Sequence, residues 1–175
     1  LSESLKENPQ IVGHGLGFEP NAFDDSDQDF QFQSPLGSDK QGRFLPYITL
    51  SDSGVPVVAP LVGYDVPGDG DWYIVPMQTE SSIITEPYLY PVNGKDVLMF
   101  TISYPIKVNG KAVGVVTADI ELDEVQGILE AGNKSGLEGV NTIMMTEAYH
   151  IIGSTIDKNY VNTSWLENPL VVNMT

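Results

Sequence analysis

The sequence contains no cysteine and only eight basic residues, of which Arg43 is the one arginine. The absence of cysteine excludes disulfide bonds, thiolate nucleophiles and cysteine-ligated zinc sites. The 24 acidic residues give a net charge of −16, which argues against binding to nucleic acid phosphates and against docking on anionic lipid. A hydrophobic fraction of 41% is nevertheless enough for a buried core, so the chain is expected to fold.

Long apolar runs are also missing, since no stretch approaches the roughly 20 residues of a membrane-spanning helix. No basic-then-apolar leader is present, and the chain begins at Leu1 rather than at methionine, so we interpret it as a segment of a longer protein. The residues of this segment are expected to make no contact with a membrane themselves.

Signatures of catalysis and of cofactor binding are lacking as well. There is no glycine-rich phosphate loop after a strand and no G-x-S-x-G motif, so we expect neither a nucleotide cofactor nor enzyme activity. His14 and His150 stand outside any metal-ligand motif. The run 25–29 starts like a calcium loop, but Phe30 stands where a glycine is needed, so we interpret it as a solvated loop without a metal.

The part of the chain after residue 43 is rich in β-forming residues, whereas residues 1–12 predict the end of a helix and residues 13–43 an irregular segment. A short helix is expected at 123–131. Strands are predicted at 44–50, 55–62, 72–77, 83–90, 96–106 and 112–122, with a further pair within 140–156. Two Asn-Gly pairs, at 93–94 and 109–110, are typical type I′ hairpin turns, so the four strands from residue 72 onward are expected to form an antiparallel meander.

Asp119 is the most informative residue for function, because it stands in an otherwise apolar strand and a buried carboxylate is costly unless it is paired. Strand alternation assigns it to one face of the sheet, which we expect to bear a pocket. Trp72, Tyr73 and Tyr88 would then form an aromatic wall that favours a cation. The alternatives are an aspartate that bonds to a neighbouring loop and aromatic residues that only pack in the core.

Five segments of the sequence, taken in order, resemble the Cache family of extracytoplasmic sensor domains. They are GFEPNAF (17–23), GRFLPY (42–47), GDWY (70–73), TEPYLYPVNGKDVLMFTISYPI (85–106) and GKAVGVVTADIEL (110–122). The likeness is greatest to the membrane-distal module of double-Cache receptors in bacterial methyl-accepting chemotaxis proteins, and it covers residues 1–130. It implies an α+β fold, with a long N-terminal helix on a PAS-like antiparallel sheet. Residues 131–175 are then expected to be the start of a membrane-proximal module or a tail packed on the first domain.

The resemblance also implies a ligand site, in which the strand aspartate holds an amino group. Its positions fall here on Trp72, Tyr73, Tyr88 and Asp119, and we add Tyr47, Asp71, Arg43 and Ser103 as further candidate ligand-binding residues. Amino-acid-binding members have an arginine where this chain has Gly70, and often an aspartate where it has Tyr90. The anchor for an amine is therefore kept, while the usual anchor for a carboxylate is lost unless Arg43 replaces it.

These features together predict the periplasmic, ligand-sensing domain of a transmembrane chemoreceptor, which signals through its helix and forms a homodimer in the full-length receptor. The expected ligand is a small amine-bearing molecule, such as a polyamine or a quaternary ammonium compound, with an amino acid second. A receptor histidine kinase or a cyclase-linked protein is an alternative context for the same module. A soluble hydrolase and a solute-binding protein are the alternatives from other classes.

Overall fold

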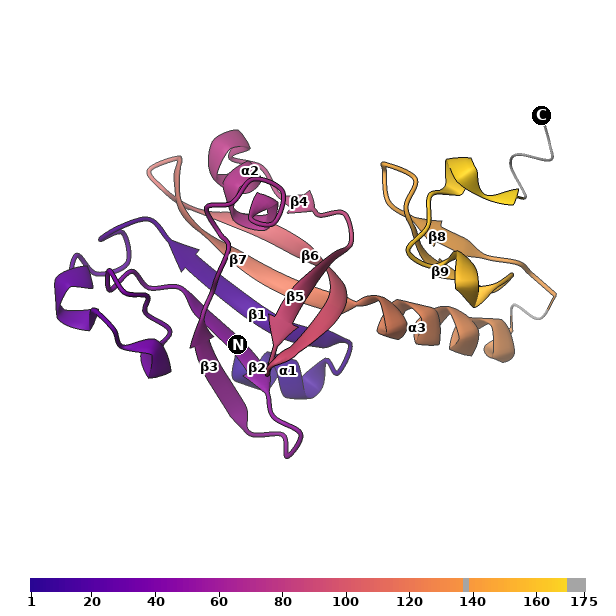
Figure 1. Cartoon of the computed structure of the whole chain (residues 1–175), viewed down its shortest axis with the longest axis horizontal. Coiled ribbons are helices and arrows are strands. Elements are labelled where there is room, and N and C mark those ends of the chain that lie inside the picture. The colour runs from indigo at the N-terminus through magenta and orange to yellow at the C-terminus, as the bar shows by residue number, and fades with distance from the viewer. Residues whose placement is uncertain (137–138, 170–175) are drawn as a thin grey trace.

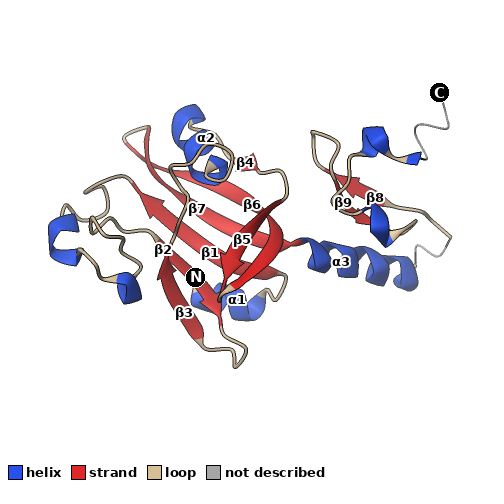
Figure 2. Ribbon diagram, in the orientation of Figure 1, coloured by secondary structure: helices blue, strands red, loops and turns tan. Residues whose placement is uncertain are grey.

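The computed structural model describes residues 1–136 and 139–169 of the chain. A large antiparallel sheet forms the N-terminal part, and the helix α3 leads from it to a small C-terminal unit (Figure 1). Figure 2 shows this mixture of helices and a curled sheet, which confirms the predicted α+β fold class. The helices and strands are α1 (Ser2–Glu7), β1 (Ile11–Phe18), β2 (Pro46–Leu50), β3 (Pro56–Pro60), α2 (Asp71–Thr79), β4 (Ile83–Ile84), β5 (Tyr88–Val92), β6 (Lys95–Val108), β7 (Lys111–Glu121), α3 (Leu122–Ser135), β8 (Ile143–Met145) and β9 (Ile151–Ser154).

The main sheet has the strand order β3-β2-β1-β7-β6-β4, and β5 also pairs with β6. All of these pairs are antiparallel. The turns between β5 and β6 and between β6 and β7 are the predicted ones: Asn93 and Gly94 have φ angles of 50° and 79°, and Asn109 and Gly110 have 52° and 82°. Positive φ at both central residues is what a type I′ turn needs, so both predicted hairpins are confirmed.

The segment that was expected to be irregular contains a strand, because β1 lies in the middle of the sheet. The prediction was wrong because three alternating glycines are typical of a loop. A Cβ on Gly13 would lie 2.5 Å from the ring of Tyr47, and one on Gly15 would lie 2.5 Å from Oγ1 of Thr117. The glycines are therefore required for side chains of the neighbouring strands to lie across β1.

The residues 72–77, predicted as a strand, belong to the helix α2 instead. Their aromatic and β-branched side chains favour strands intrinsically, but this preference depends strongly on context. Trp72, Tyr73 and Pro76 are all buried in the helix, so packing against the sheet decides the conformation. The predicted strand 83–90 is divided into β4 and β5, and the meander consists of β5, β6 and β7 rather than of four strands.

Two apolar clusters hold the described residues together. The larger one contains Leu45, Tyr47, Leu61, Trp72, Tyr73, Tyr90, Val92, Met99 and Val115. The smaller one contains Phe100, Leu122, Val125 and Ile152, and so joins β6, α3 and β9. Met99 and Phe100 are successive residues of β6, and side chains alternate along a strand, so the two clusters lie on opposite faces of the sheet.

The helix predicted at 123–131 is confirmed as α3, which is longer and continues to Ser135. It therefore runs through residue 130, where we placed a domain boundary, and that division stays a prediction. The hairpin of β8 and β9 confirms the pair of strands predicted within 140–156. The N-terminal helix α1 has six residues, and the described part of the chain holds no helix with the length and apolar character to cross a bilayer.

The outer strands of the main sheet are short. On one side β3 has five residues and begins and ends with proline, at Pro56 and Pro60. On the other side the edge is shared by β4, which has two residues, and β5, which has five. Proline has no N–H group to donate to a further strand, which suits the edge position of β3.

Candidate functional site

The carboxylate of Asp119 is the centre of the candidate site. Asp119 lies in β7 opposite Thr101 of β6, and only 3% of it is exposed. Oγ1 of Thr101 donates a hydrogen bond of 2.8 Å to Oδ1 of Asp119. Burial raises the pKa of Asp119 to about 6, against the opposing influence of the Tyr47 and Thr101 hydroxyl groups. No basic side chain of the described residues forms an ion pair with this carboxylate.

A chain of hydroxyl groups connects Asp119 with Tyr88. The Tyr88 hydroxyl lies 2.6 Å from Oγ1 of Thr101. Because the threonine gives its proton to the carboxylate, Tyr88 must donate its own proton to the threonine oxygen. Burial and the nearby Asp119 charge raise the pKa of Tyr88, so the phenol keeps the proton that it donates. The Tyr47 hydroxyl lies close to the same carboxylate, and burial likewise raises the pKa of Tyr47.

Three buried polar atoms have no hydrogen bond of regular geometry within the part of the chain that the structure describes. They are the Tyr47 hydroxyl, the indole Nε1 of Trp72 and Oγ of Ser103. Leaving such a group without a partner costs about 1–3 kcal/mol, so most buried polar groups are paired. Ser103 is two residues from Thr101 on β6, and it therefore faces the same side of the sheet.

A groove lies between α2 and the segment that joins β4 to β5. Its volume is about 460 Å³, and Trp72 and Tyr88 contribute aromatic surface to it. Asp69, Asp71 and Glu86 supply acidic side chains, and no basic residue lines it. Tyr88 also begins the hydroxyl chain that leads to the buried carboxylate. The combination of aromatic faces and negative charge suits a small cation.

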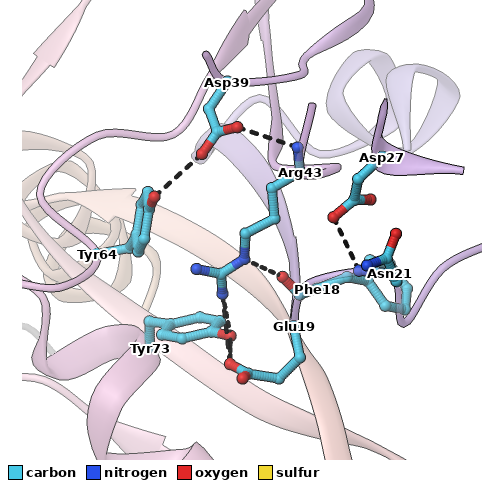
Figure 3. Close-up of polar contacts among 8 residues, drawn as sticks. All are labelled: Phe18, Glu19, Asn21, Asp27, Asp39, Arg43, Tyr64 and Tyr73. Carbon is cyan, nitrogen blue, oxygen red and sulfur yellow. Dashed lines mark hydrogen bonds and ion pairs between the residues drawn. The ribbon is translucent and has the colours of Figure 1, made fainter. Parts of the chain in front are cut away.

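Arg43 and Tyr73 belong to a separate polar network, which Figure 3 shows in close-up. Nε of Arg43 donates to the carbonyl oxygen of Phe18 at 2.6 Å, and its guanidinium pairs with Glu19 at 3.3 Å. The Tyr73 hydroxyl accepts from Arg43 and donates to Glu19. The guanidinium therefore already has a carboxylate partner, and it is not a free anchor for a ligand carboxylate.

Acidic residues of the long loop hold its backbone in the same region (Figure 3). Oδ2 of Asp27 accepts the backbone N–H of Asn21 at 2.8 Å, and Oδ2 of Asp39 accepts the Tyr64 hydroxyl at 3.1 Å. Asp27 is buried within a short 3₁₀ helix, so the interpretation of this run as a solvated loop was wrong at that residue. Among the residues that the structure describes, no group of three potential metal ligands comes together.

Comparison with known proteins assigns this architecture to one family. Residues 1–127 match the family described as methyl-accepting chemotaxis protein-like, first PDC sensor domain. The chain belongs to this family. The resemblance to Cache sensor domains of chemotaxis proteins is thereby confirmed, and so is the role of the PDC domain as an extracytoplasmic ligand-sensing module.

Related proteins include both chemoreceptors and kinases. The PDC domain is 30% identical over 149 residues to the methyl-accepting chemotaxis protein TlpQ of Pseudomonas aeruginosa, over 80% of this chain and 21% of TlpQ. The extracellular domain of the histidine kinase mmHK1S-Z3 has a TM-score of 0.76 and 28% identity, over 99% of this chain and 61% of that one. The ligand-binding domain of the Campylobacter jejuni chemoreceptor Tlp3, solved in complex with L-valine, has a TM-score of 0.57 and 18% identity, over 97% and 55%. This chain thus spans only part of each relative.

The predicted ligand-binding residues of the PDC domain divide into two groups. Those at the hydroxyl chain or in the groove are Trp72, Tyr88, Asp119, Tyr47 and Asp71. Ser103 lies on the same face of the sheet but in neither of them. Those in the separate network are Arg43 and Tyr73. Asp71 has a structural contact too, since its Oδ1 accepts the N–H of Gly68 at 2.9 Å.

Two residues of the site were not predicted from the sequence. Thr101 was missed because a threonine in a strand is common, and only its position opposite Asp119 gives it a role. The register of the Asn109-Gly110 hairpin alone would have placed Phe100 opposite Asp119, because a β-bulge between Ile106 and Lys107 shifts the pairing by one residue. Glu86 was missed although it directly precedes the Pro-Tyr pair, because its place in the groove depends on how the chain turns between β4 and β5.

Proposed function

We propose that this PDC domain binds a small amine-bearing molecule, such as a polyamine or a quaternary ammonium compound. The carboxylate of Asp119 carries the proposal, because it is almost fully buried and no cation among the described residues pairs with it. An ionised carboxylate in such surroundings is unfavourable, and a ligand ammonium group would supply the missing charge. The raised pKa of Asp119 reflects the same cost, because burial disfavours the ionised form when no positive charge is nearby.

The groove supports the same class of ligand. The aromatic faces of Trp72 and Tyr88 attract a cation by about 0.5–2 kcal/mol, depending on how dry the contact is. Asp69, Asp71 and Glu86 add a negative potential that concentrates cations at the groove. The indole N–H of Trp72 has no acceptor among the described residues, and we propose that an acceptor atom of the ligand, or a water bound with it, supplies one.

An amino acid is the second candidate ligand. The Tlp3 domain of the same fold was solved with L-valine, and here the free indole N–H of Trp72 and the Ser103 hydroxyl could receive a carboxylate. Arg43, however, is engaged by Glu19, and Gly70 leaves no arginine beside the tryptophan. A carboxylate in an acidic groove without a cationic partner is disfavoured, so we place amines first.

The wider context of the domain is also part of the proposal. Matches to chemoreceptors and to a histidine kinase support a transmembrane receptor, and we favour a chemoreceptor. In the full-length receptor the domain would act as a homodimer and signal through its N-terminal helix. Ligand binding would then shift the balance between two arrangements of the receptor.

Isothermal titration calorimetry with choline, putrescine, L-valine and succinate tests the ligand class. We expect the two amines to bind and succinate to give no heat. Asp119→Asn should weaken amine binding about 10- to 100-fold, the loss expected for a charge-assisted hydrogen bond. Asp52→Asn, which removes the same charge from an exposed turn, is the control and should leave the affinity unchanged. Tight binding of succinate without a response to amines would overturn the proposal, and binding of L-valine alone would favour the second candidate.

A further inference from the structure

The carboxylate of Glu86 both lines the groove and accepts hydrogen bonds from the C-terminal unit. It lines the groove beside Tyr88, and its Oε2 accepts a hydrogen bond of 2.7 Å from Oγ1 of Thr146 and one of 2.9 Å from Nδ1 of His150. Thr146 and His150 flank the turn between β8 and β9, in the C-terminal unit. In Figure 1 this turn reaches toward the loop between β4 and β5. One side chain therefore belongs both to the candidate ligand site and to the attachment of a distant part of the chain.

The C-terminal unit has other attachments, which lie away from this turn. Ile152 of β9 packs in the smaller apolar cluster with Phe100 of β6. Gln126 of α3 exchanges two hydrogen bonds of 2.9 Å with the backbone of Ser154. These contacts hold β9 to α3 and to the sheet whether or not Glu86 is engaged. A change at Glu86 would thus move the turn without detaching the unit.

We propose that a cationic ligand in the groove competes with Thr146 and His150 for the Glu86 carboxylate, so that filling the groove releases the β8–β9 turn. This inference rests on the proposed function, because a ligand amine is what draws the carboxylate away. It makes Glu86 a ligand-binding residue in addition to Asp119. It also names the contact through which the groove acts on the C-terminal unit.

The exposure of this contact fits such a competition. The side chains of His150 and Glu86 are 44% and 43% exposed, so water screens their attraction. A pair of this kind shifts an equilibrium by a factor of at most about five. A ligand can change a conformational equilibrium only by the difference between its affinities for the two states, and a weak contact lies within that range. A fully buried pair would be too strong to exchange.

Thermodynamic reciprocity gives the test. If the ligand loosens the hydrogen bonds between Glu86 and the turn, then loss of those bonds must strengthen ligand binding by the same factor. His150 does not line the groove, so its substitution acts on binding only through Glu86. Titration with choline and with putrescine should show that His150→Ala raises the affinity about two- to fivefold.

A double-mutant cycle isolates the role of Glu86. Glu86→Gln should lower the affinity for both probes and abolish the effect of His150→Ala. Glu147→Gln is the matched control, since Glu147 is an exposed acid of the same turn and its side chain makes no hydrogen bond to the groove residues described. The control should bind both probes like the wild type.

Hydrogen exchange gives a second readout that does not depend on ligand. Amides of residues 146–150 should exchange several-fold faster in ligand-free Glu86→Ala, which has no acceptor for Thr146 and His150, than in the wild type, and saturating choline should have the same effect on the wild type. An unchanged affinity in His150→Ala overturns the coupling even where both amines bind. If neither amine binds the wild type, the proposed function fails and the coupling fails with it, so the two failures are told apart by the wild-type titration.

Discussion

Tyr88, Thr101 and Asp119 form a chain of hydroxyl groups that begins at the groove and ends at a buried carboxylate. Each member has a fixed direction, because an ionised carboxylate only accepts and Thr101 has a single proton to give. The chain orients Oδ1 of Asp119, and the Tyr47 hydroxyl lies near the same carboxylate, whereas Thr101 donates nothing to Oδ2. That oxygen is the atom that we expect an ammonium group to meet.

Amine affinity should depend on pH through Asp119. The pKa of this residue is raised to about 6 in the empty domain, so the carboxylate is ionised at pH 7.5 and mostly protonated at pH 5. A protonated carboxyl group cannot pair with an ammonium ion, so the affinity for choline should fall about tenfold between these pH values. Calorimetry from pH 5 to pH 8 measures this, and Asp119→Asn should give a nearly flat profile. A profile for the wild type as flat as that of the variant would contradict the assignment.

The same carboxylate should lower the stability of the empty domain at neutral pH. Because its folded-state pKa is raised above the ordinary value of 3.8, the folded state holds the proton more tightly than the unfolded state does. Its contribution to stability is therefore lost as the pH rises from about 4 through 6. Asp119→Asn should raise the free energy of unfolding by about 1–3 kcal/mol at pH 7.5 and by little at pH 4. Urea unfolding at both pH values, with Asp52→Asn as control, checks this.

The sequence could indicate which residue of β7 is unusual, but not all of its neighbours. Asp119 was found because a charge in an apolar strand violates the ordinary pattern of burial. Arg43 was placed beside the ligand as a conceivable anchor, whereas it pairs with Glu19. That pairing joins the end of β1 to the loop before β2, and no short-range pattern reports such a contact.

At the level of elements, β1 is unusual because it presents glycine at alternate positions to the larger apolar cluster. The Tyr47 ring lies where a side chain of Gly13 would be, and Oγ1 of Thr117 lies where one of Gly15 would be. Because β1 has no side chains at these positions, the side chains of β2 and β7 extend across it. This arrangement brings the Tyr47 hydroxyl of β2 close to Asp119 of β7, across the intervening strand.

Gly13→Ala should therefore damage both stability and binding. The added Cβ would displace the Tyr47 ring, with an expected loss of about 1–3 kcal/mol in the free energy of unfolding. Amine affinity should fall as well, since Tyr47 lies beside Asp119. Gly127→Ala is the matched control: Gly127 lies in α3 with open space around it, so alanine should stabilise the protein by about 0.5–1 kcal/mol. Equal effects of the two substitutions would contradict this account of β1.

The elements that could be predicted are those whose signal is local. The Asn-Gly turns require left-handed φ values, which few residues adopt easily, so the β5–β6–β7 hairpins follow from four residues. The helix α2 could not be predicted in this way, because Trp72 and Tyr73 are strand-forming residues that are helical only through burial against the sheet. The glycines of β1 were interpreted as a loop for the same reason. Glycine is required there because side chains of the neighbouring strands occupy the space of a Cβ, and the local sequence does not show this.

At the scale of the whole molecule, the two apolar clusters stabilise different parts of the structure. The larger one stabilises the sheet and includes Tyr47 and Trp72 of the candidate site, while the smaller one attaches the C-terminal unit through β9 and α3. Ile152→Ala should cost about 2–4 kcal/mol locally, because it removes a buried side chain from the smaller cluster. Hydrogen exchange should then quicken in β8 and β9 while β1 and β7 remain protected. Faster exchange throughout the sheet would show that the clusters are not independent.

One rim of the main sheet is the short, proline-bounded β3, and the other is divided between the two-residue β4 and the five-residue β5, which restricts how copies of the domain can associate. Neither rim presents a long row of free N–H and C=O groups on which another sheet could grow. Edge-to-edge strand pairing between the sheets of two neighbouring receptors is therefore disfavoured, and so is the growth of fibrils by that route. Pairing of subunits is thereby left to helices and side chains, whose contacts can form and separate as a signal requires.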